Sequence, residues 1–339
     1  MILAVASCSS ERGGESVDID GSVVPSMPCT SVLGETPHVR LCAVTRAPNN
    51  PMISPVTHPG ISQNITMPSV IRAPDALARA AGLQPYWMYF AAHDGHYIRL
   101  AHAPAPTGPW ALHVPGSLKD TEVAPFSNTI SSPDVFVLPS GTLRMYFSTD
   151  SYPGSTEQWS GVSESSDGIR FTLASTQNIA KYYLRVFEWN GMQYGLQKGW
   201  STAPAEVGVS TDGIARFEPI KTLSGGSIRH VAVLRKGSTL LVFFSKIGDA
   251  PERILLSTID LDTPVAEWDL SAPIEVLRPE LPYEGISAPI APSVKGPATN
   301  VQQLRDPYVF EDDGKTYLYY AVAGESGIAS AEIRYELVP

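Results

Sequence analysis

Apolar and polar segments alternate along the chain in a pattern that recurs five times. Each unit has a short apolar strand, a tight turn, a strand rich in Tyr and Phe, a polar loop and a further apolar strand. In the last and fullest unit these are residues 305–310, 311–314, 316–320 and, after the loop, 327–331. Repeats of this kind are typical of small antiparallel sheets arranged around an axis. The pattern therefore predicts an all-β fold, a five-bladed β-propeller with a central channel.

Local signals agree with this architecture. The strands are near-continuous apolar and aromatic runs, which suits strands covered on both faces. The dipeptides Asn190-Gly191, Lys236-Gly237 and Asp313-Gly314 predict hairpin turns. Only residues 75–81 have a helical pattern, about two turns long, and we expect an insertion there in the first unit. No Gly/Ser linker divides the repeats, so residues 26–339 are expected to form one domain.

The ends of the chain carry a further expectation. The last unit ends on its third strand near Ile333, with little chain left for a fourth. An early segment such as residues 38–45 is therefore expected to supply the outer strand of the last blade. Cys29 and Cys42 either close a short disulfide loop or remain two free buried thiols.

Composition and the N-terminus bear on partners and location. A formal net charge of -10 without a basic cluster argues against nucleic acid and against an anionic membrane surface as partners. The apolar run before Cys8 resembles the lipobox of bacterial lipoproteins, although a positive n-region is absent, and a chance apolar start is the alternative. We expect residues 1–25 to be a lipoprotein signal remnant and tether. The protein would then be an exported cell-envelope monomer whose membrane attachment is a lipid on Cys8.

In a propeller, the starts of the first strands and the loops between second and third strands meet at one mouth of the channel. The polar groups that this geometry gathers are an expected functional site, because isolated buried charges are costly unless they pair or hold a ligand. From first-strand starts they are Asn64, Ser69, Asp134, Arg185, His230, Arg305 and Asp306. From the loops they are His93, Asp94, His96, Asp150, Lys198, Asp249, Glu252, Arg253 and Glu325.

Two motifs carry a family resemblance. Ser132-Pro133-Asp134-Val135 and the stretch from Arg305-Asp306-Pro307 to Tyr317 resemble the five-bladed propeller glycoside hydrolases of families 43 and 32 and their relatives, over residues 60–335. The chain is also similar to uncharacterised bacterial proteins grouped with family 43 by fold. The resemblance implies a blade-start Asp as base or nucleophile, a second Asp that orients and tunes, and a Glu as acid. Asp134 and Asp306 match the two Asp motifs.

The chain also departs from the family pattern. The Arg-Asp-Pro motif is in the last unit instead of the first, where Pro68-Ser69 stands, and Arg185 occupies the third-blade position of the expected Glu. Family 117, a propeller relative that uses a His as acid, makes His230 an acid candidate beside Glu252. Each has a structural alternative: turn capping for Asp134 and Asp306, a surface ion pair with Arg253 for Glu252, and a buried core position for His230.

The remaining candidates are assigned to substrate binding. Guanidinium groups match a carboxylate, either one of the protein's own or that of a uronate. Trp159 and Trp200 lie near the mouth and are expected platforms for sugar rings, whereas Trp87 is expected in the core. His93, Asp94 and His96 have metal-ligand chemistry, but no regular spacing enforces a site, so no metal or cofactor is expected to be required. The substrate-binding candidates are Arg185, Arg253, Arg305, Asn64, His93, His96, Asp249, Glu325, Trp159 and Trp200.

Together these observations predict a glycoside hydrolase that acts on a polysaccharide or oligosaccharide at the channel mouth. The catalytic candidates are Asp134, Asp306, His230 and Glu252. Ser69, where the resemblance implies an Asp, favours a rival, a surface lipoprotein that binds glycan without cleaving it. A sugar-acid lyase that uses His230 is a third possibility. Fold does not decide between them.

Overall fold

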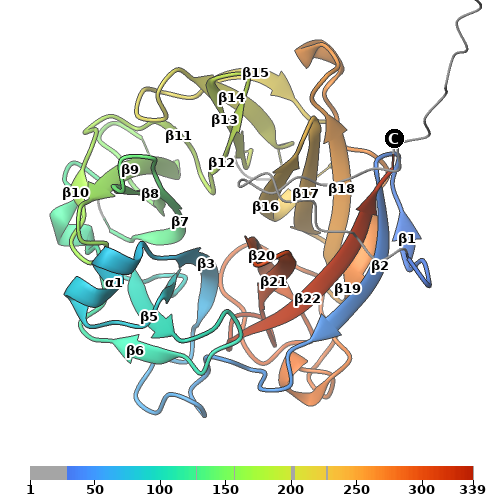
Figure 1. The fold of residues 1–339 in the computed structure, drawn as a ribbon, viewed down its shortest axis with the longest axis horizontal. Helices are drawn as coiled ribbons and strands as arrows, with labels where there is room; N and C mark the ends of the chain where they lie inside the picture. The colour runs from blue at the N-terminus through green and yellow to red at the C-terminus, as the bar shows by residue number, and fades with distance from the viewer. Residues whose placement is uncertain (1–28, 127, 156, 200–202, 227, 339) are drawn as a thin grey trace, which may run out of the picture.

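A computed structural model describes residues 29–126, 128–155, 157–199, 203–226 and 228–338. These residues form five antiparallel sheets arranged as the blades of a propeller (Figure 1). Nearly all of the regular structure is β-strand, and the innermost strand of each blade lies nearest the centre of the ring in Figure 1. The predicted all-β, five-bladed propeller is therefore confirmed.

The blades follow one another along the chain. Blade 1 holds β3 (Thr66–Arg72), β4 (Tyr86–Ala91), β5 (Arg99–Ala103) and β6 (Ala111–His113). Blade 2 holds β7 (Ser131–Val137), β8 (Leu143–Thr149), β9 (Trp159–Ser165) and β10 (Thr172–Leu173), with β11 (Ala180–Lys181) also on β9. Blade 3 holds β12 (Arg185–Trp189), β13 (Met192–Gln197), β14 (Glu206–Ser210) and β15 (Glu218–Thr222).

The ring is completed by two further blades. Blade 4 holds β16 (Ile228–Lys236), β17 (Thr239–Lys246), β18 (Ile254–Asp260) and β19 (Ile274–Leu277). Blade 5 holds β20 (Arg305–Asp312), β21 (Lys315–Ala321), β22 (Ile328–Leu337), β2 (Val39–Arg46) and β1 (Gly34–Glu35). The short helices are α1 (Asp75–Ala81) between β3 and β4, and the 3₁₀ turns Asp120–Glu122, Val265–Glu267 and Pro282–Glu284.

The predicted turns explain how each blade reverses direction. At Asn190-Gly191 and Asp313-Gly314 both residues have positive φ, 49° and 74° in the first pair and 50° and 68° in the second. A two-residue hairpin of this kind needs the left-handed region at both positions, which Asn, Asp and Gly tolerate best. The α1 helix stops at Gly82, whose φ of 66° lets its N–H reach back to the last helical carbonyls.

Aromatic and aliphatic side chains fill the spaces between neighbouring blades. The largest buried cluster runs through the first four blades and includes Trp87, Phe147, Leu196 and Trp268. Separate clusters join blade 4 to blade 5 and blade 5 to blade 1. Because each sheet is covered on both faces by its neighbours, the near-continuous apolar runs are what this packing requires. No helix within the described ranges is both long enough and apolar enough to cross a membrane.

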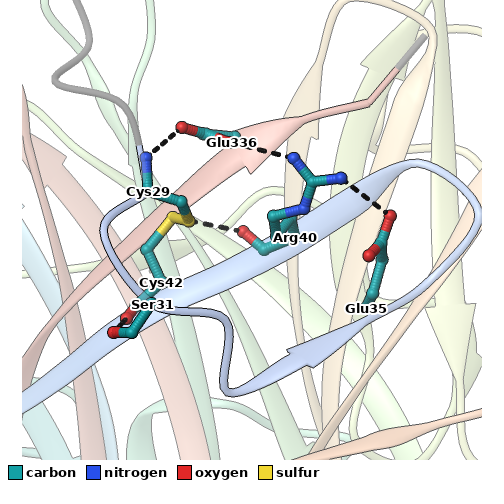
Figure 2. The surroundings of a disulfide bond; sticks show 6 residues. All are labelled: Cys29, Ser31, Glu35, Arg40, Cys42 and Glu336. Atoms are coloured by element: carbon teal, nitrogen blue, oxygen red, sulfur yellow. Dashed lines mark hydrogen bonds and ion pairs between the residues drawn. A yellow bond between two sulfur atoms is a disulfide. The ribbon is translucent and has the colours of Figure 1, made fainter.

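The N-terminal part of the described chain provides the outer strands of the last blade. β2 pairs antiparallel with β22, from Val39 opposite Leu337 to Arg46 opposite Ala331. This is the segment for which the sequence predicts that role. The disulfide between Cys29 and Cys42 fastens the chain ahead of β1 onto β2, and Glu336 of β22 accepts a hydrogen bond from the backbone N–H of Cys29 (Figure 2). Of the two alternatives for these cysteines, the disulfide is the one found.

Candidate functional site

Four inner strands begin with a shift in their pairing, and in three of them the shift includes a proline. In β3, β7 and β20 the pairing with the next strand shifts across two residues, Met67-Pro68, Ser132-Pro133 and Asp306-Pro307. Proline suits the unpaired position because it has no N–H to donate. The residue before each proline has positive φ, 60°, 50° and 47° respectively, which is rare outside glycine and is often found at functional sites. These bulges aim side chains into the channel at matched depths.

This equivalence changes how the two motif aspartates relate to each other. Asp306 occupies the first bulge position, where β7 has Ser132. Asp134 stands two residues further along, where β3 has Ser69 and β20 has Tyr308. The sequence treats Asp134 and Asp306 as two residues that frame one site, and the structure places them in two successive layers of the channel. Ser69 is therefore the counterpart of Asp134 and not of Asp306.

The deeper layer, here called the inner layer, consists of Ser69, Asp134, Arg185 and Tyr308. One Asp134 carboxylate oxygen, Oδ2, accepts a hydrogen bond of 3.2 Å from the backbone N–H of Val186. Burial raises the pKa of Asp134 to about 6, against the opposing effects of the Arg185 charge and this hydrogen bond. The inner layer thus holds a carboxyl group that is close to half-protonated near pH 6.

Arg185 is held inside the channel and not at its mouth. Its guanidinium carbon lies 4.3 Å from the centroid of the Tyr183 ring, and its Nε donates to the Val231 carbonyl oxygen at 3.1 Å. Its Nη2 is buried without a hydrogen-bond partner among the described residues. A side chain so placed supports the channel wall. Arg185 is not among the described residues that line the cavity at the mouth, and its substrate-binding role stays a prediction.

The layer above, here called the mouth cluster, is built around Asp306. Its carboxylate accepts hydrogen bonds from the hydroxyls of Thr66 and Tyr183, the latter at 2.9 Å. Nε2 of His230 lies 3.3 Å from Oδ1 of the same carboxylate. Burial and the nearby Glu325 charge raise the pKa of Asp306, which the two hydroxyl donors partly offset. Residues from blades 5, 1, 3 and 4 therefore meet on one carboxyl group.

His230 is held by Asp306 through both ring nitrogens. The backbone N–H of Asp306 donates to Nδ1 of His230 at 3.4 Å, so the ring proton of a neutral imidazole belongs on Nε2, facing the carboxylate. Burial, followed by the charges of Arg229 and Arg305, lowers the pKa of His230 well below its ordinary value. His230 is therefore neutral at neutral pH. A neutral imidazole accepts a proton more readily than it donates one, which weighs against the acid role expected for it.

Glu252 and Glu325 are bridged by one guanidinium. Arg305 contacts Oε2 of Glu252 through Nε at 2.9 Å and Oε1 of Glu325 through Nη1 at 2.7 Å. All three side chains are 0% exposed. Burial raises the pKa of Glu252, and Ser245 donates a hydrogen bond of 2.6 Å to its Oε1. Glu252 therefore pairs with Arg305 in the interior, and the surface ion pair with Arg253 considered from the sequence is wrong.

Asn64 and His93 complete the cluster from blade 1. The Asn64 side-chain amide donates to Glu325 at 2.7 Å, and its carbonyl oxygen accepts the backbone N–H of His93 at 2.7 Å. Nδ1 of His93 lies 3.3 Å from the Glu325 carboxylate. Although burial disfavours the charged imidazole, this carboxylate raises the pKa of His93. Burial opposes ionisation of Glu325, yet His93 and Arg305 hold the pKa of Glu325 below its ordinary value.

A cavity of about 320 Å³ opens above the cluster. Of the catalytic candidates, only His230 contributes to its lining, whereas Asp306 and Glu252 lie behind that wall and are 0% exposed. The lining also carries several cationic side chains and one exposed carboxylate, that of Glu157. The described residues that line it are His93, Glu157, Gln158, Tyr182, Lys198, Gly199, Arg229, His230, Lys295 and Gly296.

Several predicted residues do not join the cluster. Arg253 contacts Asp249 at 3.3 Å and Glu275 on the outer strand β19 at 2.9 Å, so it points away from the channel. His96 is exposed and pairs with Asp120 at 2.6 Å. The structure does not bring Arg253, Asp249 and His96 into the mouth cluster, because local ion pairs hold them.

The two tryptophan platforms have different outcomes. Trp159 begins β9, is 8% exposed, and lies 5.6 Å from the Arg216 guanidinium, measured to its ring. It packs at the blade surface and is not among the described residues that line the cavity. Trp200 lies outside the described residues. The ring that the cavity does present is that of Tyr182.

The sequence did not single out four residues of the site: Thr66, Tyr182, Tyr183 and Arg229. Tyr183 has a φ of 59°, like the bulge residues of the other blades, and it reaches Asp306 from the equivalent position of blade 3. Arg229 directly precedes His230 in the same strand start. Alignment of the units on their prolines would have found the bulge position, but the third and fourth units lack that proline.

The metal-ligand chemistry noted in the sequence does not converge. His93 pairs with Glu325, His96 pairs with Asp120, and Asp134 belongs to the inner layer. Within the described ranges, the one group of three ligand-type side chains close enough to hold an ion is Cys29, Cys42 and Glu336. Both cysteines of that group are in the disulfide. The carboxylates of the mouth cluster contact Arg305, Asn64 and hydroxyl groups instead.

Comparison with known proteins gives one sequence relative and many structural ones. No family model matches the chain. An uncharacterised protein of Acanthamoeba polyphaga mimivirus is 33% identical over 326 residues, which cover 86% of this chain and 90% of the viral protein. The chain belongs to the same family as this viral protein. Because that relative is itself uncharacterised, membership of this family does not assign an activity to the chain.

Solved structures similar to this one are five-bladed propellers that act on carbohydrate. A glycosyl hydrolase from Bacteroides ovatus has a TM-score of 0.60 and 13% identity, covering 91% of this chain and 95% of its own. The β-1,2-mannobiose phosphorylase from Listeria innocua has a TM-score of 0.60 and 13% identity, with coverage of 85% and 96%. A family 43 β-xylosidase/α-arabinofuranosidase from a compost metagenome has a TM-score of 0.55 and 14% identity, covering 88% of this chain and 96% of its own. At such identities the likeness establishes the shared fold.

Proposed function

We propose that this protein cleaves a glycosidic bond in a polysaccharide or oligosaccharide held in the cavity at the channel mouth. The observation that carries the proposal is the meeting of Asp306 from blade 5 with His230 and Glu252 from blade 4, beneath that cavity. Titratable groups whose pKa values are pushed in different directions within one cluster are typical of active sites. The structural neighbours named above act on glycosidic bonds with the same fold.

The two groups suit opposite proton transfers. His230 is neutral and lines the cavity, and it accepts a proton from an attacking water if its Nδ1 exchanges the hydrogen bond from the Asp306 N–H for that proton. The resulting imidazolium would be stabilised by the Asp306 carboxylate beside Nε2. Burial raises the pKa of Glu252 above its ordinary value, the direction that a proton donor needs, although the Arg305 charge opposes this shift. Nδ1 of His230 lies 3.9 Å from Oε1 of Glu252, so both belong to one continuous cluster.

One observation favours a second candidate function, glycan binding without cleavage. Glu252, Glu325 and Asp306 are each 0% exposed, and each already accepts hydrogen bonds or ion pairs from neighbouring residues. Carboxylates occupied in this way stabilise a wall, and none of the three is among the described residues lining the cavity. A surface protein that captures glycan would keep this wall and lack turnover.

The decisive experiment screens the purified chain against aryl glycosides and oligosaccharides, with release of reducing ends as the measure of turnover and calorimetry as the measure of binding. Asp306→Asn, His230→Asn and Glu252→Gln are expected to lose turnover while they still bind the substrate found. Wild-type protein that binds a glycan of the panel without cleaving it establishes the capture protein instead.

Glu284→Gln is the matched control for these variants. Glu284 is also a 0% exposed carboxylate with an Arg partner, Arg46, at 2.7 Å, but it lies at the 3₁₀ turn Pro282–Glu284 beside blade 5. Its loss is expected to lower stability without lowering turnover per folded molecule. A parallel loss of turnover in Glu284→Gln would mean that the mouth variants act through stability alone.

The export expectation is kept here as a proposal. Cys8 lies outside the described residues, and the support available is the Cys29–Cys42 disulfide, since such bonds persist mainly in oxidising compartments. We propose that the protein is an exported lipoprotein of the cell envelope, anchored through Cys8. Mass spectrometry of the mature N-terminus from its native host tests this, and an unmodified Cys8 there would refute it.

A further inference from the structure

We propose that the cavity at the channel mouth binds an oxyanion, either the carboxylate of an acidic sugar or free phosphate, between Lys198, Lys295 and Arg229. This proposal rests on the proposed function only in placing the substrate in that cavity. It names the chemistry of the ligand, which the carbohydrate fold by itself leaves open.

The charges around the cavity are unequal. Lys198, Lys295 and Arg229 line it, and Glu157 is the one acidic side chain among the described lining residues. Neither lysine forms an ion pair with an acidic group anywhere in the described ranges. The acidic residues of the mouth cluster are buried behind the wall and are already matched by Arg305, Arg229 and His93. The excess charge of Lys198 and Lys295 therefore faces the empty space, where an anionic ligand would balance it.

The chain holds these cations in place with its own backbone. Arg229 donates hydrogen bonds to the carbonyl oxygens of Val294 and, at 2.8 Å, Gly296, which fixes the segment that carries Lys295. Nε of Arg229 is buried with no hydrogen-bond partner in the described part of the chain. Holding this segment beside the cavity restricts its conformational freedom. An anion would then bind to cations that are already in position, which lowers the entropic cost of binding.

Lys198 is the most informative member of the set. Its backbone N–H donates to the Tyr182 carbonyl oxygen at 3.0 Å, and its Nζ lies 5.8 Å from the centroid of the Tyr182 ring. Burial, with the charges of Arg229 and Lys295, lowers the pKa of Lys198 to about 8, against the opposing charges of Asp306 and Glu252. Two further cations therefore lie close to Lys198, and an anionic ligand between them would stabilise all three charges.

Calorimetric titration of the full chain tests the proposal with three probes: glucuronate, glucose as its neutral counterpart, and inorganic phosphate. Glucuronate or phosphate is expected to bind more tightly than glucose. Lys198→Met is expected to weaken oxyanion binding by about 10- to 100-fold, the range of a lost charge-assisted hydrogen bond. Lys295→Met, at an exposed position, weakens it less. Lys221→Met, on the outer strand β15, is the matched control and leaves binding unchanged.

The pH dependence gives an independent readout. Lys198 is charged below its pKa and neutral above it, so glucuronate affinity in the wild type is expected to fall about tenfold from pH 7 to pH 9. Glucuronate itself stays ionised over that range. Lys198→Met removes this dependence. Equal binding in wild type and Lys198→Met, or no preference for either oxyanion over glucose, overturns the proposal.

The outcomes separate this inference from the proposed function. Saturable glucuronate binding identifies the acidic sugar as the source of the oxyanion, and phosphate binding without glucuronate binding identifies free phosphate. Cleavage of a neutral glycan by a chain that binds neither oxyanion refutes this inference and leaves the proposed function intact. Oxyanion binding without cleavage of any glycan in the panel does the reverse.

Discussion

The two polar layers of the channel use similar residues in opposite ways. In the mouth cluster, Arg305 contacts two carboxylates at 2.9 and 2.7 Å and is fully matched. In the inner layer, Arg185 donates to backbone carbonyls and stacks on Tyr183, and its Nη2 has no hydrogen-bond partner among the described residues. Asp306 receives two hydroxyl donors and an imidazole, whereas Asp134 receives one backbone N–H.

The difference shows that the environment of a carboxylate depends on its depth in the channel. Asp306 and Asp134 lie two residues apart along equivalent inner strands, which is enough to move a carboxylate from beneath the cavity to the channel interior. A matched cluster next to open space would suit the proposed function, because its groups are fixed before a ligand arrives. Asp134 and Arg185 in the inner layer have fewer charged partners, and we interpret this layer as part of the channel wall that contains one titratable carboxyl group.

The largest effect is expected from removal of the guanidinium that bridges the mouth. Arg305→Met leaves Glu252 and Glu325 buried without their main counter-charge, and we expect the free energy of unfolding to fall by about 3 to 5 kcal/mol. Arg185→Met is the comparison and is expected to cost less, since Arg185 has no ion pair at hydrogen-bond distance in the described ranges. Urea unfolding measures both. A larger loss for Arg185→Met would show that the inner layer is the more tightly coupled.

The second effect concerns the Asp134 carboxyl group and depends on pH. Its folded-state pKa of about 6 lies above the ordinary value of 3.8, so the folded state binds the proton more tightly and stability is lost as pH rises from about 4 to 6. Asp134→Asn lacks this loss. Between pH 4 and pH 7 we expect the variant to gain about 2 kcal/mol relative to wild type. A stability difference that stays constant across this pH range would contradict the raised pKa.

A third prediction concerns the hydroxyl that Tyr183 donates to Asp306. Tyr183→Phe leaves the ring in place and is expected to cost about 1.5 to 3 kcal/mol of stability, as for a hydrogen bond to a charged group. Tyr320→Phe is the matched control, because Tyr320 donates to the buried Glu284 at 3.1 Å outside the channel. Only Tyr183→Phe is expected to lower turnover or glycan binding. Equal losses of turnover or glycan binding in both variants would show that the Tyr183 hydrogen bond has no particular role in the site.

The smallest effect marks the boundary of the mouth cluster. Arg253 is 38% exposed and pairs with Asp249 and Glu275, so Arg253→Met is expected to change stability by less than about 1 kcal/mol. Glycan binding, measured by calorimetry, is expected to remain as in the wild type. A clear loss of binding would return Arg253 to the site, where the sequence had placed it.

The sequence by itself determined the repeat, the number of blades and the turns. These depend on local chemistry: Asn-Gly and Asp-Gly at left-handed positions, and apolar runs of strand length. It also indicated Asp306, His230, Glu252, Arg305, Glu325, Asn64 and His93, because strand starts and loops of a closed ring must meet at one mouth.

Only the tertiary structure decided which of these residues touch. The depth of Asp134 relative to Asp306 depends on the register of the bulges. Glu252 is followed by Arg253 in the sequence, but the arginine that it pairs with is Arg305, from the next blade. The cation-lined cavity likewise depends on Arg229 holding residues 294–296 from across the mouth. Such contacts join residues more than 50 positions apart, and pairing over that range is set by packing and charge matching, which local sequence patterns do not encode.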